Sequence, residues 1–332
     1  MAIRRIFGLN VETDYPFETP LPFASGASGA PDLAFTFRPP EPGRPVQPEG
    51  PPSVESPVRL DGGAPLFALY HHPGGHLLRF TEVADFILGE KRITCHLLDP
   101  AYAYMVEVHL LGIVFAFWFE ERGVPMLHAS AVSVDGTALV FMATNKGGKS
   151  SLAGAFMQLG FPLLSDDLVG LEASSGDILA RPGFPSMRLW PDQAAHFLGD
   201  WRDLALAHPR VDKRRVSVGP EGFGTFVDAP HPMGGIYLPQ RVSQWTGARP
   251  AEITPLSQRE GVMELVRGSF LPRVVHAAGQ APHRLNLFSR LVASVPVKRL
   301  RYVEGVSRLP EVCDELLKDL RESRGATRGG DL

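Results

Sequence analysis

The chain has 332 residues, a formal net charge of −3 and 44% hydrophobic residues. This length suits one large domain or a main domain with a smaller partner, and the nearly neutral balance excludes a broad basic surface for nucleic acid. Cys95 and Cys313 lie far apart and show no metal-ligand or redox spacing. We expect two buried thiols in a reducing compartment, with a single disulfide as the alternative. No secretory signal is readable, which predicts a cytoplasmic protein.

Residues 1–120 predict a small, mostly β domain. Short strands are expected at 4–11, at 33–37 and again from 65 to 98, with turn signals between them. The segment 38–57 is rich in proline. Because proline has no amide donor, this segment is predicted to be an exposed loop outside any sheet, and a connector more than a site for a proline-binding partner.

An apolar helix is predicted over 100–121. Its core, 110–119, is too short to cross a bilayer, and charged residues flank it on both sides. A buried helix is the first interpretation, and peripheral contact with lipid is the alternative. No transmembrane segment is expected. His71, His72 and His76 cluster around a Pro-Gly-Gly turn and predict a polar hairpin tip, with a zinc site as the second reading.

The central region changes to an α/β pattern and is predicted to form a second domain over 121–322. Apolar runs at 126–134 and 137–142 flank the turn Asp135-Gly136, and a glycine-lysine loop, a helix at 151–159 and a strand at 161–164 follow. Helices are expected near 256–269, 282–293 and 309–320, with a strand at 295–302. The tail 323–332 is predicted to be flexible.

The loop 143–150 matches the phosphate-binding pattern G-x-x-x-x-G-K-[ST] except for alanine at its first position. Glycines let the backbone approach phosphate oxygens, a lysine neutralises the β- and γ-phosphates, and a serine hydroxyl ligates Mg²⁺. Lys146 is read either as a further phosphate contact or as a solvated loop lysine. The loop therefore predicts a site for ATP and Mg²⁺ that contains Asn145, Lys146, Gly147, Gly148, Lys149, Ser150 and Ser151.

Two further features lie at suggestive spacings from this loop. Asp166 and Asp167 end the strand that follows the loop's helix, where a carboxylate can reach Mg²⁺ or a substrate hydroxyl. Adjacent residues on a strand face opposite sides, so the two carboxylates are expected to have different roles. A cap for the following turn is the structural alternative. His128 precedes the loop, and a lone histidine among apolar neighbours is more often a core residue.

The combination resembles a known family. The run His128-Ala129-Ser130-Ala131-Val132, the glycine loop and Leu164-Ser165-Asp166-Asp167 resemble the catalytic domain of HPr kinase/phosphorylase, and more closely the wider group of HPr-kinase-like serine kinases. The runs 181–185 and 188–191 are similar to that wider group as well. The resemblance covers about residues 124–193 and departs from the pattern at Ala143 and Lys146. The later signature needed for phosphorolysis is not recognisable, so a true HPr kinase is not expected.

The resemblance implies a P-loop core related to phosphoenolpyruvate carboxykinase, with a mixed sheet. It implies that Asp166 is the catalytic acid/base, that Asp167 helps to hold the metal or to order the loop, and that His128 lies beside the phosphates. Related kinases carry a basic turn like 212–215, which makes Lys213 and Arg214 candidates for transition-state or acceptor contacts, with Arg188 as second choice. A solvated charged face is the alternative for that turn.

The predicted function is transfer of the γ-phosphoryl group of ATP to a hydroxyl, with Ser150 and Asp167 at the metal. A peptide or protein serine, a lipid and a saccharide stay open as acceptors, and so does oligomerisation, because true HPr kinases form hexamers. The rival from another class is a nucleotide-binding regulatory protein that transfers no phosphate.

Overall fold

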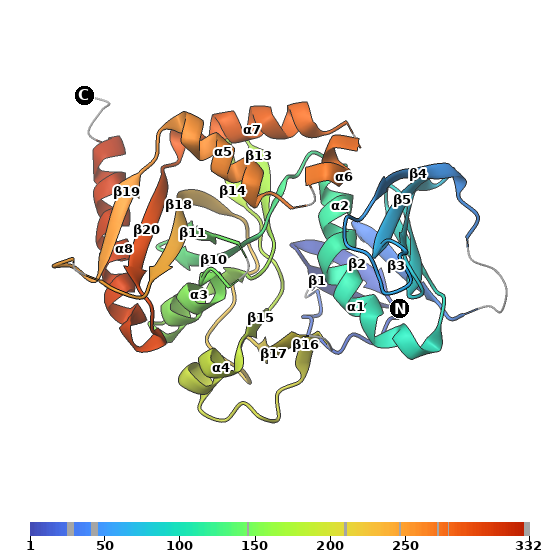
Figure 1. Ribbon diagram of the computed structural model, residues 1–332, viewed down its shortest axis with the longest axis horizontal. Coiled ribbons are helices and arrows are strands. Elements are labelled where there is room, and N and C mark those ends of the chain that lie inside the picture. Colours follow the sequence, from blue (N-terminus) through green and yellow to red (C-terminus); the bar gives the residue numbers. More distant parts are fainter. Residues whose placement is uncertain are drawn as a thin grey trace. The chain divides into compact units, whose positions relative to one another are not determined.

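The computed structural model describes residues 1–24, 30–40, 46–144, 146–208, 211–245, 247–270, 272–277 and 279–328. The chain forms two compact units, and each is taken by itself below (Figure 1). The first unit contains Met1–Gly123 together with Leu271–Ala281, and the second contains Val124–Phe270 with Pro282–Leu332. The architecture is mixed α/β.

The first unit is built on an eight-stranded sheet in the order β1-β2-β3-β8-β7-β6-β5-β4. β2, β3 and β8 are parallel neighbours, and the other neighbouring pairs are antiparallel. The strands are β1 (Ala2–Ile6), β2 (Leu9–Thr13), β3 (Leu33–Arg38), β4 (Glu49–Glu55), β5 (Phe67–His72), β6 (Gly75–Phe80), β7 (Ala84–Leu88) and β8 (Arg92–Leu97).

Two sequence predictions about this sheet are wrong. The single strand predicted at 4–11 is a hairpin, because Phe7 and Gly8 both take positive φ and turn the chain between β1 and β2. The proline-rich segment does enter the sheet, as β4. This strand occupies the edge, where a proline without an amide donor is tolerated, and its register with β5 shifts across the prolines between Glu49 and Val54. Residues 41–45 of the same segment lie outside the described residues.

One apolar helix covers Pro100–Glu120, as expected, through η1 (Pro100–Tyr102), α1 (Ala103–His109), η2 (Leu110–Val114) and α2 (Phe115–Glu120). Its backbone departs from helical angles at Gly112. The helix is long and apolar enough to cross a membrane by length and composition, but 61% of its most apolar window is buried. Phe7 packs against Phe115 and Phe119, which is what a core helix requires. The short helix α6 (Pro272–Ala277) also belongs to this unit.

The second unit is built on a nine-stranded sheet whose centre is β10-β11-β18. β11 is parallel to β18, and β18 is parallel to β20. The strands of this sheet are β9 (Met126–Leu127), β10 (Ala129–Val134), β11 (Thr137–Met142), β12 (Leu163–Ser165), β13 (Val169–Ser174), β14 (Asp177–Ala180), β18 (His231–Val242), β19 (Ala251–Pro255) and β20 (Val297–Val303). β15 (Ser186–Leu189), β17 (Val211–Ser217) and β16 (Leu206–His208) form a separate three-stranded sheet.

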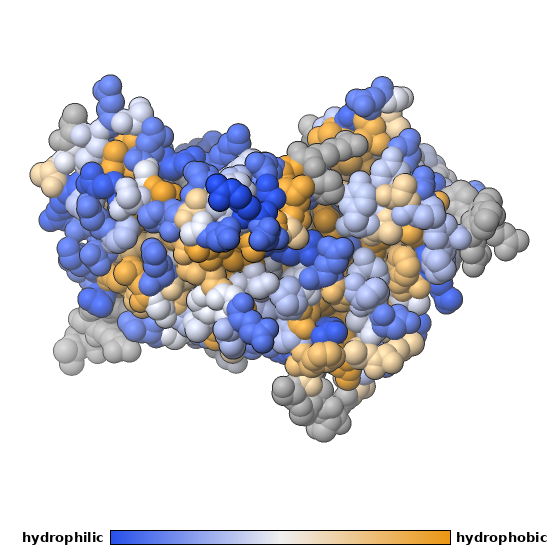
Figure 2. Space-filling model, turned by 90° about the horizontal axis from the view of Figure 1, so that it is seen from below, coloured by the Kyte–Doolittle hydropathy of each residue, from blue (hydrophilic) through white to orange (hydrophobic). Residues whose placement is uncertain are grey.

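Helices cover both faces of the nine-stranded sheet (Figure 1). Leu139 and Phe141 of β11 face one core with α3 (Lys149–Gln158), α4 (Pro191–Leu198) and α8 (Leu309–Arg328). Ala138 and Val140 face the other core with α5 (Gln258–Gly268) and α7 (Ala281–Ser294). A strand buried on both sides reads as a continuous apolar run, which is why 137–142 was recognisable from sequence. Hydrophilic residues dominate the face seen in Figure 2, with apolar residues showing between them.

Several elements of this unit lie close to their predicted ranges. The turn Asp135-Gly136 joins β10 to β11, and both residues have positive φ, as a tight hairpin requires. The strand predicted over 126–134 is interrupted at His128 and divides into β9 and β10. The helix predicted over 309–320 continues to Arg328. Residues 329–332 of the expected tail lie outside the described part of the chain.

Candidate functional site

The glycine-lysine loop (residues 143–150, of which 145 is not described) connects β11 to α3. Lys146 and Gly148 both have positive φ, at 63° and 94°, so both residues take left-handed backbone conformations before the helix begins. Ala143 is not among the positive-φ residues, which explains how alanine replaces the expected glycine. α3 begins without a side-chain cap, which leaves its first amides free for an anion.

Both glycines at the loop's end are required by close contacts. A Cβ on Gly147 would lie 2.4 Å from the Cβ of Ala143 and 2.9 Å from the Thr144 carbonyl oxygen. A Cβ on Gly148 would lie 2.4 Å from the Tyr302 hydroxyl. The loop is therefore folded tightly on itself and rests on the ring of Tyr302.

Lys149 is folded back against its own loop. Its Nζ donates to the carbonyl oxygens of Ala143 (2.8 Å) and Thr144 (3.3 Å), and lies 3.1 Å from Nε2 of His128. An ammonium can only donate, so Nε2 of His128 accepts, and its Nδ1 donates to the Asp167 carbonyl oxygen at 3.1 Å. Burial lowers the pKa of Lys149, against the opposing influence of Asp167 and Asp166. The fold thus brings His128 and the loop lysine together.

Asp166 accepts hydrogen bonds from three separate elements. Its Oδ1 accepts from the hydroxyls of Ser130 on β10 (2.5 Å) and Ser150 on α3 (2.9 Å), and its Oδ2 accepts from the backbone amide of Arg188 on β15 (2.9 Å). Only 7% of Asp166 is exposed. This carboxylate therefore ties the start of α3 to two strands at one point.

Asp167 lies beside Asp166 but has a different environment. β12 ends at Ser165, and the φ of Asp167 is 74°, so the separation of the two carboxylates comes from a left-handed turn and not from strand alternation as predicted. Arg188 donates to Oδ2 of Asp167 at 2.7 Å, and Nδ1 of His128 lies 3.4 Å from Oδ1. Burial alone would raise the pKa of Asp167, but Arg188, His128, Lys213 and Lys149 together hold that pKa below its usual value.

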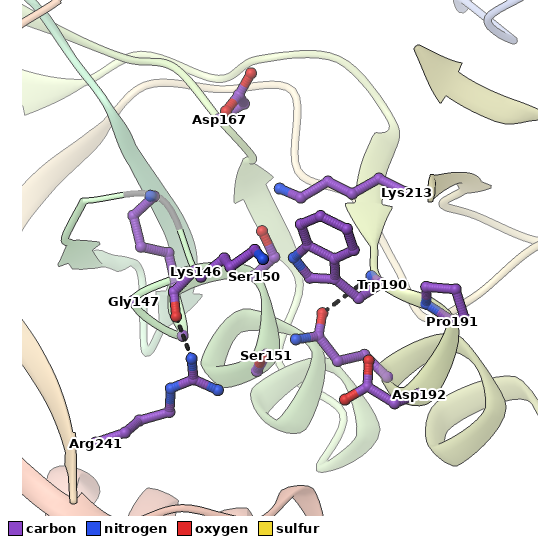
Figure 3. A pocket seen from close by; sticks show the side chains of 13 residues that line it. Lys146, Gly147, Ser150, Ser151, Asp167, Trp190, Pro191, Asp192, Lys213 and Arg241 are labelled. Atoms are coloured by element: carbon purple, nitrogen blue, oxygen red, sulfur yellow. Dashed lines mark hydrogen bonds between the residues drawn. The ribbon is translucent and has the colours of Figure 1, made fainter. Parts of the chain in front are cut away.

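Lys149, Ser150 and Asp167 border a cavity of about 400 Å³ within the second unit, whereas Asp166 and His128 are not among its lining residues. Figure 3 shows Asp167 and Lys213 toward one end of it, and Arg241, Ser151 and Asp192 toward the other, with Trp190 beside the middle. The loop forms one wall and the first turn of α4 forms another. The lining residues are Lys146, Gly147, Gly148, Lys149, Ser150, Ser151, Asp167, Trp190, Pro191, Asp192, Gln193, Lys213 and Arg241.

The basic turn predicted at 212–215 is a strand, β17, and its cations point to different places. Lys213 lines the cavity, whereas Arg214 donates to Asp212 and to the Leu204 carbonyl oxygen and lies over the Trp201 ring. Alternation along a strand explains the difference. Lys213 therefore lines the cavity, and Arg214 does not.

Trp190 links the two walls of the cavity. The Nζ atoms of Lys146 and Lys213 lie 5.1 Å and 5.7 Å from the centre of its rings, within range of a cation–π interaction. Lys146 is exposed, and its ammonium lies over the indole of Trp190 in this structure. The sequence placed Trp190 in a resembling run but carried no signal for this contact.

Three other residues at the site were not predicted from sequence. Ser130 carried no signal beyond its place in the resembling run, two residues after His128. Arg241 and Tyr302 come from β18 and β20, where nothing in the local sequence marks them. Only the pairing of distant strands brings them to the loop. Asn145, which was predicted to bind the nucleotide, lies outside the described residues.

Other candidate groups lie away from this cavity. Cys95 and Cys313 are free and buried, as expected, and burial raises the pKa of each thiol. His76 pairs with Glu121 in the first unit. Within the described ranges, no three His, Cys, Asp or Glu side chains come together as a metal-binding group, so the zinc reading of the hairpin tip has no support.

Comparison with known proteins gives a distant result. No family model matches the chain, and no curated protein does. Among solved structures, the chain is similar to the Hpr(Ser) kinase/phosphatase from Coxiella burnetii, with 12% sequence identity and a TM-score of 0.29. The match covers 60% of this chain and 98% of that one. A likeness at this level does not establish a family, so the interpretation of the site rests on its own geometry.

Proposed function

We propose that this protein is an ATP-dependent phosphotransferase with a hydroxyl acceptor, and that the glycine-lysine loop is its phosphate-binding loop. The observation that carries the proposal is the hydrogen bond from Ser150 to Asp166 next to the buried Lys149. A serine after the loop lysine, touching a strand-end carboxylate, is the arrangement in which P-loop proteins hold a nucleotide and its magnesium ion. The mixed α/β fold and the cavity are compatible with a nucleotide site. A core related to phosphoenolpyruvate carboxykinase is part of the same proposal.

The donor set at Ser150 fits Mg²⁺. This ion prefers hard oxygen ligands, keeps several waters and binds through one or two carboxylates plus phosphate oxygens, so no preformed cage is required. The Ser150 hydroxyl and the Asp166 carboxylate would hold it. When bound, Mg²⁺ neutralises charge on the β- and γ-phosphates. The sequence assigned the metal to Ser150 and Asp167, but the hydrogen bonds favour Asp166 as the carboxylate partner of Ser150.

Asp167 is then the carboxylate available to the acceptor. Asp167 lines the cavity, and the basic groups around it keep it ionised. An ionised carboxylate beside the transferred group orients a hydroxyl and takes its proton. In the proposed step the acceptor oxygen bonds to the γ-phosphorus, the bond between that phosphorus and the bridging oxygen of ADP breaks, and the hydroxyl proton passes to Asp167. Lys149 and Lys213 balance the charge of the migrating group.

The direct test uses labelled ATP and three variants: Lys149→Ala, Asp166→Asn and Asp167→Asn. Incubation with cell extract, divided afterwards into protein, lipid and small-molecule pools, identifies the acceptor class. We expect Lys149→Ala and Asp166→Asn to weaken nucleotide binding and transfer together. Asp167→Asn is expected to bind Mg-ATP normally and to lose transfer by roughly 100-fold or more, the contribution typical of a general base.

The same experiment separates the alternatives. A nucleotide-binding regulatory protein would bind ATP and label no pool, and Asp167→Asn would then change nothing. Labelling of the protein pool favours a peptide or protein serine, whereas the other two pools correspond to lipid and saccharide acceptors. If the two single variants Lys149→Ala and Asp167→Asn both transferred phosphate at the native rate, that result would contradict the proposed mechanism.

A further inference from the structure

Arg241 occupies the end of the cavity away from Asp167 and Lys213 (Figure 3). Its guanidinium donates a hydrogen bond to the backbone carbonyl of Lys146, one of the two positive-φ residues in the described part of the loop. The residue lies next to the end of β18, a strand parallel to β11, so it stands at the same carboxyl edge from which the loop departs. Arg241 is therefore attached to the loop although it belongs to a distant segment.

The orientation of a bound nucleotide follows from the two ends of this cavity. If the γ-phosphate lies toward Asp167 and Lys213, as the proposed function requires, the nucleoside lies toward Arg241, Ser151 and Asp192 (Figure 3). A guanidinium is planar and stacks on aromatic faces, and it still has donors left after one hydrogen bond to a carbonyl. Lysine offers no such plane.

We propose that Arg241 binds the nucleoside half of the nucleotide by stacking on its base, while its bond to the Lys146 carbonyl couples base binding to the shape of the loop. The inference rests on the proposed nucleotide site but assigns a residue outside the loop pattern. Tyr302, the register neighbour of Arg241 on β20, contacts the same loop: its hydroxyl and Cδ of Arg241 both lie near the position of a Cβ on Gly148. Two side chains of one strand pair thus contact the loop.

The test compares two ligands, Mg-ATP and magnesium tripolyphosphate, which shares the phosphates but has no nucleoside. Arg241→Lys keeps a cation and a donor for the Lys146 carbonyl but removes the plane. We expect Arg241→Lys to weaken Mg-ATP binding by roughly fivefold to tenfold, the size of a partly exposed cation–π contact, and to leave tripolyphosphate binding unchanged. Arg301→Lys is the matched control, since Arg301 is half exposed on β20 and pairs with Glu252.

Two results would overturn the inference. An equal loss for both ligands would make Arg241 a phosphate contact or a general support of the loop, and no loss for either would leave it without a ligand role. Lys149→Ala, measured in parallel, separates this question from the proposed function. If the wild-type protein binds neither ligand, or if Lys149→Ala binds both as well as the wild type, the nucleotide site itself is wrong.

Discussion

Arg241 and Tyr302 are register partners on the adjacent parallel strands β18 and β20, and the side chains of both approach Gly148. The Tyr302 hydroxyl is buried and has no hydrogen-bond partner among the described residues. A buried polar group without a partner costs free energy, so its position under the loop is not explained by stability alone. The side chains of Arg241 and Tyr302 instead limit the space beside Gly148.

The first prediction concerns Gly148. Gly148→Ala forces an L residue into a positive φ and places its Cβ 2.4 Å from the Tyr302 hydroxyl. We expect loss of nucleotide binding and a decrease in the free energy of unfolding of about 2 kcal/mol or more, measured by urea titration. Gly160→Ala is the control, because Gly160 has nearly the same φ with nothing within 4 Å of its added Cβ. Equal effects at the two positions would show that backbone strain, and not the contact with Tyr302, is responsible.

The second prediction concerns the hydrogen bonds of Asp166. Ser130→Ala removes one of its three donors from a fully buried position. The expected loss in free energy of unfolding is about 1.5–3 kcal/mol, as for hydrogen bonds to charged groups, with a severalfold weaker affinity for Mg-ATP. Ser289→Ala, which removes an exposed hydroxyl bonded within α7, serves as the control. A stable Ser130→Ala protein with native affinity would contradict the role given to this network.

The third prediction concerns acid pH. The pKa of Asp167 is depressed in the folded protein, so its ionised form stabilises the fold above its unfolded pKa of about 3.9, and this stabilisation is lost as pH falls through the lower folded value. Arg188→Gln removes the strongest of the cations around Asp167. We expect the variant to lose stability at higher pH than the wild type when urea midpoints are measured across the acid range. Arg308→Gln, in an exposed pair with Glu311, should leave the profile in place.

The fourth prediction concerns Lys149 and alkaline pH. Burial lowers its pKa in the free protein, and a phosphate beside the ammonium would raise that pKa again. Nucleotide binding at alkaline pH should therefore take up protons, which calorimetry in buffers of different ionisation enthalpy detects. Lys149→Met should abolish the uptake. Proton release, or no exchange at any pH, would argue against phosphate at this lysine.

The fifth prediction uses Trp190 as a reporter. Phosphate oxygens should draw the ammonium groups of Lys146 and Lys213 away from the indole, and its emission should change. We expect ATP to alter tryptophan fluorescence in the wild type and in Trp245→Phe, but not in Trp190→Phe. A signal that persists without Trp190 would assign it to another indole.

The parts of the site that are continuous in the chain were predictable from the amino-acid sequence. The loop, the helix α3 and the two aspartates are local patterns with characteristic residue types, so the positions of the loop and of Asp166 follow from sequence alone. The orientation of each carboxylate does not, because it depends on the left-handed turn at Asp167 and on Arg188 from another sheet. The roles of Arg241 and Tyr302 could not be predicted for a similar reason. The pairing of β18 with β20, and not a sequence motif, places both residues beside the loop.

The incorrect predictions about the fold have the same origin. Phe7 showed no turn signal because aromatic residues rarely adopt positive φ, and tertiary packing against Phe115 overrides that preference. The prolines of β4 argued correctly against a central strand but did not exclude an edge. His128 divides one predicted strand into two, and that break is what brings its ring to Lys149.

The support of Gly148 by Tyr302 also has a consequence for the order in which the protein is made. β11, the loop and α3 are synthesised before β20, which lies far downstream of them in the chain. A nascent chain that has not reached Val297 holds the complete loop sequence without the ring beneath it. If the loop binds nucleotide as proposed, we expect the nucleotide to stabilise the loop only after β20 has been synthesised and has folded against it.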